Sequence, residues 1–218
     1  MLMVRPFSHR VRIGIATVLA TSLCLASSLA MAWESELDQL RQRWETATTS
    51  TPASQREGTL TTLADEAVQL VQANPNVSDL LVWQGIVQAS LAREKGGLGA
   101  LDDAKAARRA LERAVTLDAD GMQGSAYVTL GALYDRVPGW PVAFGDDEKA
   151  EQMFQKAMAI RPDGIDVNYY YAVYLADEGR KQEARSHAEK AANGAPRPDR
   201  EASDQALQAE ARTLLGSL

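Results

Sequence analysis

Cysteine and histidine are nearly missing from this chain of 218 residues. It has one cysteine, Cys24, and two histidines, His9 and His187. A single cysteine cannot form an intrachain disulfide, and the segment after Cys24 offers no thiolate as a metal ligand or a nucleophile. The fold must therefore be stabilised by packing, for which a hydrophobic content of 45% is sufficient.

Acidic side chains are missing from the first part of the chain. Three arginines among the first twelve residues precede an uncharged run over 13–26, and Ala30–Ala32 provides a small-x-small site. This pattern is typical of a secretory signal peptide, so we predict that residues 1–32 are removed on export to the periplasm. An uncleaved anchor is the alternative, because residues 13–33 are near the length that spans a bilayer. The protein would then contact the membrane only through this segment.

Basic residues are outnumbered in the rest of the chain. Without residues 1–32 it has 20 basic and 29 acidic residues, a net charge of −9. Nucleic-acid binding requires a basic face that neutralises phosphates, so we expect no nucleic-acid partner. The residues before Cys24 do not form a bacterial lipobox, which argues against a lipoprotein.

One pattern of small and large residues recurs along the exported part. Two antiparallel helices approach closely only where small residues face each other and large residues fill the gaps beside them, and a proline ends the second helix. A step of 34 residues separates Pro162 from Pro196, which end the second and third copies. The clearest copy reads Tyr127-x2-Leu130-Gly131-x2-Tyr134 and then Ala150-x3-Phe154-x2-Ala157-x4-Pro162.

The pattern divides the exported chain into helical hairpins. Residues 78–198 are predicted to form three repeats, the first with about ten extra residues that include Gly96–Gly99. Residues 33–77 are predicted to form a degenerate hairpin whose second helix opens with a capping box at Ser54–Glu57. Residues 199–218 are predicted to form a solitary helix that covers the last repeat. We therefore expect an all-α fold of about nine helices.

At these positions the chain resembles the tetratricopeptide-repeat (TPR) superfamily, over nearly all of its exported part. The resemblance implies a TPR-type helical-hairpin solenoid and says little about function. The segments 137–146 and 164–169 are also similar to exported bacterial TPR proteins and, less closely, to the T-component proteins of TRAP transporters. The second resemblance implies an apolar cleft and a periplasmic solute-binding protein as the partner. The chain departs from the lipoprotein form of that family in lacking a lipobox.

The first helix of each pair faces the concave side of a TPR solenoid, where motif positions 2, 5, 9 and 12 share one face. In this chain the face is mostly apolar, and it lacks the Lys, Arg and Asn that would pair with acidic peptide tails. We predict that it binds an apolar helix, an extended peptide or a lipid-like molecule; ordinary core packing is the alternative. The candidate residues are Val82, Ile86, Val128, Asp135, Tyr169 and Val173.

A stiff loop over residues 135–147 is the other candidate. Prolines flank Gly139-Trp140, so the loop should hold Trp140 and Phe144 at fixed positions. One interpretation is an aromatic clip at the mouth of the concave groove or at a partner surface. The other is that both rings plug the end of this repeat.

Five acidic residues and one histidine are interpreted as structural. Asp146–Glu148 lies where a helix must begin, so capping and the helix dipole explain it without a metal ion. The same interpretation applies to Asp163 and Asp166 at the next helix start. His187 is predicted to lie on a solvated helix face. Because no nucleophile elbow, P-loop, dinucleotide motif or metal-spaced set is present, we expect no enzymatic activity, metal or cofactor.

These features predict a non-enzymatic periplasmic scaffold that binds a protein partner. The first alternative is a carrier or accessory subunit that holds an apolar small molecule. A structural role through a homo-oligomer formed at the solenoid ends is a further alternative.

Overall fold

The computed structural model describes residues 33–218. The predicted signal peptide and Cys24 therefore lie outside the described residues. The chain divides into two compact units, Met1–Asp38 and Gln39–Leu218. In the first unit the described residues, 33–38, are helical. All that follows concerns the second unit.

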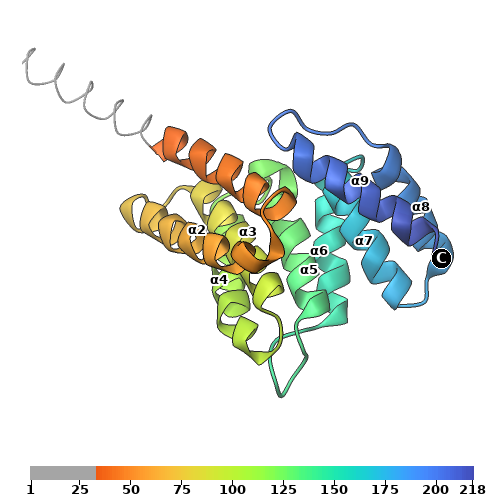
Figure 1. Ribbon diagram of the computed structural model, residues 1–218. Coiled ribbons are helices and arrows are strands. Elements are labelled where there is room, and N and C mark those ends of the chain that lie inside the picture. The colour runs from red at the N-terminus through yellow and green to blue at the C-terminus, as the bar shows by residue number, and fades with distance from the viewer. Residues whose placement is uncertain (1–32) are drawn as a thin grey trace, which may run out of the picture. The chain divides into compact units, whose positions relative to one another are not determined.

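The second unit is built from helices (Figure 1), which confirms the predicted all-α class. Among the described residues there is no β-strand, and one isolated bridge joins Gly139 to Gly145. After a helix over residues 39–49, the elements are α2 (Ala53–Ala73), α3 (Ser78–Lys95), the 3₁₀-helix η1 (Leu98–Ala100), α4 (Leu101–Leu117), η2 (Gly121–Gly124), α5 (Ser125–Arg136), α6 (Asp147–Ile160), α7 (Ile165–Asp177), α8 (Lys181–Asn193) and α9 (Glu201–Leu215).

The helices pack as the hairpins of a TPR-type solenoid. The pairs are α3 with α4, α5 with α6, and α7 with α8, and the first helices of successive pairs also contact one another. Small residues allow the close approach, as predicted. A Cβ atom added at Gly85 would lie 2.4 Å from Cγ of Leu111, and one added at Gly131 would lie 2.7 Å from Cε1 of Phe154. Each glycine therefore makes room for a large side chain of the second helix.

The helix over residues 39–49 and α2 lie ahead of the first repeat. Arg43 donates to Glu66 of α2 at 2.5 Å, and α2 packs against α3. The predicted capping box at residues 54–57 is wrong. The N-cap of α2 is Pro52, with no side-chain cap, so the helix already includes Ser54 in its first turn.

The extra residues of the first repeat lengthen its helices instead of forming a long loop. Helices α3 and α4 have 18 and 17 residues, against 13 each for α7 and α8. Only residues 96–100 separate α3 from α4. Gly96 and Gly97 have φ values of 61° and 58°, so these two residues end α3 in a conformation that other residues rarely adopt.

Helix α9 packs on α7 and α8, the last helical pair. Its buried Ala211 lies in a small apolar cluster with Ala191 and Ala192 of α8. Alanines at this contact let α9 lie close to α8. The other face of α9 is free to line the groove described below.

Candidate binding groove

A groove runs along the first helices of the three pairs. Helix α3 contacts α5, α5 contacts α7, and these helices line a cavity of about 1160 Å³ together with α9. Residues three and four positions apart share one helix face, so the repeats present the same side of each first helix to the groove. Its apolar lining residues include Ile86, Ala89, Val128, Ala132, Leu133, Tyr169, Ala206 and Leu207.

The two ends of the second unit meet beside this groove. Arg41 forms an ion pair with Asp199, and the backbone N–H of Ser203 donates to the Glu45 carboxylate at 2.8 Å. Residues of the helix over 39–49 and of α9 therefore both line the groove, which has walls beyond the three repeats. These contacts join distant parts of the chain, so a pattern that repeats every 34 residues could not predict them.

Four of the predicted binding residues line the groove. They come from all three first helices: Ile86 from α3, Val128 and Asp135 from α5, and Tyr169 from α7. Ile86 and Val128 are 6% and 4% exposed, so each presents only an edge to the cavity. The groove surface is formed mainly by partly exposed neighbours such as Ala132.

Val82 and Val173, two other predicted binding residues, do not line the groove. Val82 is 1% exposed and belongs to the core. The physical reason is that α3 is buried on nearly all sides, because α2, α4 and α5 all pack against it. Val173 is half-buried but does not line the groove.

The aromatic loop places its two rings in different surroundings. Phe144 packs edge-on against Tyr134, with ring centroids 5.8 Å apart, and the Arg108 guanidinium lies 4.3 Å from the Phe144 ring centre. Trp140 is 89% exposed. Neither ring lines the groove. Phe144 thus packs against the end of its repeat, as the second interpretation expects. Trp140 neither packs there nor lies at the mouth of the groove.

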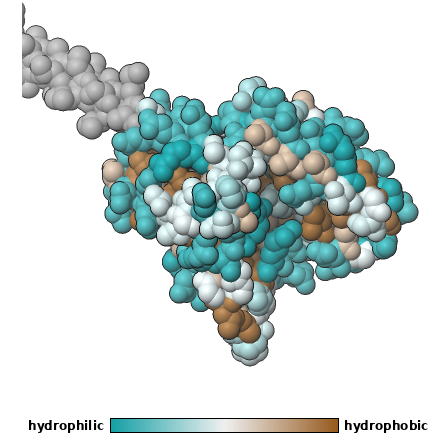
Figure 2. All heavy atoms as spheres, viewed as in Figure 1, coloured by the Kyte–Doolittle hydropathy of each residue, from teal (hydrophilic) through white to brown (hydrophobic). Residues whose placement is uncertain are grey.

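The base of this loop is fixed by backbone contacts. The Gly145 N–H donates to the carbonyl of Pro138 at 3.0 Å, and the Asp146 N–H donates to that of Tyr134 at 2.9 Å. A Cβ atom at Gly145 would lie 1.8 Å from the carbonyl oxygen of Val137, so only glycine fits there. Apolar surface gathers near the tip of the loop (Figure 2), where Val142 is 53% exposed.

The acidic residues at helix starts fall into two groups. Asp146 is the N-cap of α6, and its carboxylate accepts from the Lys149 N–H at 3.0 Å, which confirms the cap interpretation. Neither Asp163 nor Asp166 is an N-cap, but Asp166 lies in the first turn of α7, where its carboxylate accepts from the Val167 N–H at 2.9 Å, as the helix-dipole interpretation expects. The N-cap of α7 is Gly164, with no side-chain cap. Asp163 is exposed, and Asp166 is buried among arginines.

Four charged side chains form an ion cluster where α7 begins and where the chain enters α9. Asp166 accepts from Arg161 at 2.6 Å and pairs with Arg197 at 3.2 Å, and Arg197 pairs with Asp204 at 2.6 Å. Burial by itself would raise the pKa of Asp166, but Arg197 and Arg161 outweigh burial and hold that pKa below its usual range. The cluster thus stays charged and joins α7 to α9.

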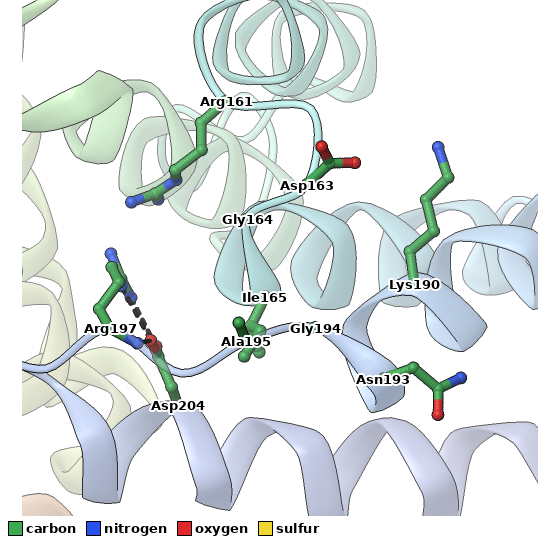
Figure 3. A pocket seen from close by; sticks show the side chains of 10 residues that line it. All are labelled: Arg161, Asp163, Gly164, Ile165, Lys190, Asn193, Gly194, Ala195, Arg197 and Asp204. Carbon is green, nitrogen blue, oxygen red and sulfur yellow. Dashed lines mark hydrogen bonds and ion pairs between the residues drawn. The ribbon is translucent and has the colours of Figure 1, made fainter.

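A smaller pocket, of about 530 Å³, lies against this cluster. Figure 3 shows Arg161 and Arg197 on one side of it and Lys190 on the other, with the ion pair between Arg197 and Asp204 drawn. Because both arginines already contact carboxylates of the cluster, this pocket has a structural explanation.

His187 does not lie on a solvated face, contrary to the prediction. Its Nδ1 is 2.8 Å from Oδ1 of the buried Asn168, and its ring lies 4.8 Å from that of Tyr171. Burial and the nearby Lys190 lower the pKa of His187. The ring is therefore a neutral packing and hydrogen-bonding group at neutral pH.

Asp135 is a groove carboxylate with a raised pKa. Burial raises the pKa of Asp135 from 3.8 to about 6, against a lowering by Arg136, and Asp177 adds a further increase. A carboxylate in this position is partly protonated in mildly acidic solution. The groove therefore changes charge in that pH range.

Over residues 33–218, no group of three or more His, Cys, Asp or Glu side chains is arranged to hold a metal ion. Within the same range, every helix is too short or too polar to cross a membrane.

Comparisons with known proteins give little further information. No family model matches the chain, and no curated protein matches it. Among solved structures, the chain is similar to a crystal structure of MamA, with 21% sequence identity and a TM-score of 0.34. The match covers 63% of this chain and 90% of that chain. A likeness at this level gives no information about what this chain binds.

Proposed function

We propose that this protein is a non-enzymatic periplasmic scaffold that binds an apolar segment of a protein partner in the groove between its first helices and α9. The observation that carries the proposal is the groove itself, about 1160 Å³ in volume, with apolar side chains from three repeats and from α9. Burying apolar side chains of a partner there would supply the binding free energy through a few central contacts.

The resemblance to T-component proteins makes a periplasmic solute-binding protein the first partner to test. Such a protein would present an apolar helix or loop to the groove, with Trp140 as an additional exposed contact outside it. Aromatic side chains are frequent anchors at protein interfaces.

Filling the groove tests the proposal. Ala132 is half-buried and lines the groove, so Ala132→Arg would occupy the cavity without removing a core side chain. Ala209→Arg is the matched control, because Ala209 is exposed and does not line the groove. Each variant is used to capture partners from cross-linked cell envelopes of its own organism, with thermal unfolding as the folding control. We expect the captured protein to be lost with Ala132→Arg and kept with Ala209→Arg. Equal capture by both variants would contradict the proposal.

The second candidate function is carriage of an apolar small molecule. The helix over 39–49 contacts α9 beside the groove, and residues of both line it. These additional walls favour a small molecule because they enclose more of its surface. Native mass spectrometry of protein purified from its own envelope separates the candidates. A bound small-molecule mass that Ala132→Arg removes would favour the carrier, whereas an unliganded mass would speak against it.

A further inference from the structure

The ion cluster has a fifth charged neighbour, Arg200. Arg200 lines the same groove as Asp166, and the charges of Arg197, Asp166, Asp204 and Arg161 all act on its pKa. Both carboxylates of the cluster are already occupied by Arg161 and Arg197. Three cations therefore face two anions, and Arg200 carries the surplus positive charge.

The guanidinium of Arg200 lies against two aromatic faces. Its Cζ is 4.9 Å from the ring centre of Trp44 and 5.0 Å from that of Trp83. These faces attract a cation but offer no hydrogen-bond acceptor in the ring plane. Over residues 33–218, no side chain or carbonyl accepts a hydrogen bond from this guanidinium, and its Nε is buried without a partner. The Nε1 of Trp83 is likewise buried without a partner.

Arg200 also lines the groove, at the end where Asp166 and Ser203 lie. Burial and the positive charge of Arg197 lower the pKa of Arg200 to about 10, so the side chain is still charged at neutral pH. Arg200 is half-buried, and a guanidinium whose N–H groups lack hydrogen-bond acceptors in such a place costs free energy. The open groove is the route by which a partner for this charge can arrive.

We propose that Arg200 binds a carboxylate carried by the apolar partner segment that occupies the groove. The inference rests on the proposed function and adds the chemistry of the partner. The local charge beside the ion cluster selects the group: one surplus cation matches one carboxylate, and guanidinium binds carboxylate through two parallel hydrogen bonds. Elsewhere the groove is lined by the acidic residues Glu94, Asp135, Asp177 and Glu210, so a second carboxylate on the partner segment would be repelled there. The apolar lining selects the remainder of the segment. The expected partner motif is thus an apolar stretch with a single acidic group, either a side chain or a chain end.

One other arginine of the groove provides a matched control. Arg56 also lines the groove, but its guanidinium pairs with Glu94 at 3.2 Å, so its charge is already balanced. Removing Arg56 should keep the preference for a carboxylate over its amide, whereas removing Arg200 should abolish that preference. Arg200→Met keeps an unbranched stem against the two tryptophans, and Arg56→Met makes the equivalent change.

The probes are pooled N-acetylated hexapeptides randomised over alanine, valine, leucine and isoleucine. One pool has a free C-terminal carboxylate, and a second has a single glutamate with an amidated C-terminus. Each is matched by a pool in which the carboxylate is replaced by its amide. Binding is measured by tryptophan fluorescence, since Trp44 and Trp83 flank Arg200. We expect at least one carboxylate pool to bind about tenfold more tightly than its amide pool, and the preference to persist in Arg56→Met and to vanish in Arg200→Met.

The outcomes separate this inference from the proposed function. If carboxylate and amide pools bind equally, Arg200 has no role in recognition, but the groove still binds apolar peptides. If no peptide pool binds and sodium decanoate does, the occupant is a lipid-like carboxylate. Both the proposed peptide-binding function and the proposed peptide ligand of Arg200 would then be wrong. The melting temperature gives a further readout. Arg200→Met should melt no lower than the wild type in the absence of ligand; a large loss would make Arg200 a structural residue and overturn the inference.

Discussion

Two buried regions of this protein are held together by different forces. Inside the second pair, Phe154 packs over Gly131 and is completely buried. Between α7 and the segment before α9, the ion cluster is also buried, but its stability depends on complete pairing of charges. An apolar contact loses free energy in proportion to the area and volume removed, whereas an ionic contact fails when one partner is missing. The substitutions below test this difference, from the largest expected effect to the smallest.

Phe154→Ala should have the largest effect, a loss of about 4 kcal/mol in the free energy of unfolding. The phenyl ring fills the space that Gly131 leaves, and Tyr171 stacks on it with centroids 5.5 Å apart. Urea unfolding measures the loss. Because the contact is apolar, the loss should be the same at low and high salt; a strong salt dependence would contradict the account.

Asp204→Ala should lower the free energy of unfolding by about 3 kcal/mol. Asp204 is 1% exposed and accepts hydrogen bonds from the backbone N–H, Nε and Nη2 of Arg197, so its removal leaves that guanidinium buried with fewer partners. The double variant Asp204→Ala/Arg197→Met should recover part of the loss in urea unfolding. A double variant that is less stable than the sum of the two single variants would argue against an ionic role.

Gly131→Ala should lower the free energy of unfolding by about 2 kcal/mol, because the added methyl group overpacks the core. The added methyl group would lie 2.7 Å from Cε1 of Phe154, too close for the ring to remain in place. Phe154→Leu shortens the opposing side chain and should reduce the cost of Gly131→Ala when both are present. Thermal unfolding of the four proteins measures this coupling, and additive effects would show that the two residues do not share the contact.

Asp135→Asn should stabilise the protein by about 1–2 kcal/mol at pH 7. The pKa of Asp135 is raised in the folded state, so the folded protein holds this proton more strongly than the unfolded chain between pH 4 and pH 6. Wild-type stability should therefore fall as the pH rises through this range, and Asp135→Asn should lack that part of the decrease. The two proteins should be equally stable near pH 4. If Asp135→Asn were more stable than the wild type by the same amount at every pH, the raised pKa of Asp135 would not be the cause.

The sequence predicted the contacts that the repeat encodes. Gly131 and Phe154 occupy TPR positions, and the groove residues Ile86, Val128 and Tyr169 follow from the same spacing. Val82 was misplaced because the spacing gives the face of a helix but not how many neighbours cover it.

Contacts outside the repeat could not be predicted. The ion cluster and Arg200 depend on where the segment before α9 returns to α7 and to Trp44. No periodicity in the sequence carries that information. Arg200 is consequently one of the groove residues that sequence reasoning missed, and the only available signal was its place at the start of the final predicted helix.

The central claim, that a protein partner occupies the groove, is tested most directly by photo-crosslinking inside cells. A photoreactive amino acid is placed either at position 132, which lines the groove, or at position 209, which is exposed outside it. We predict that position 132 gives a crosslink to one discrete protein and that position 209 does not. A crosslink from position 209 alone, or none from position 132, would contradict the claim.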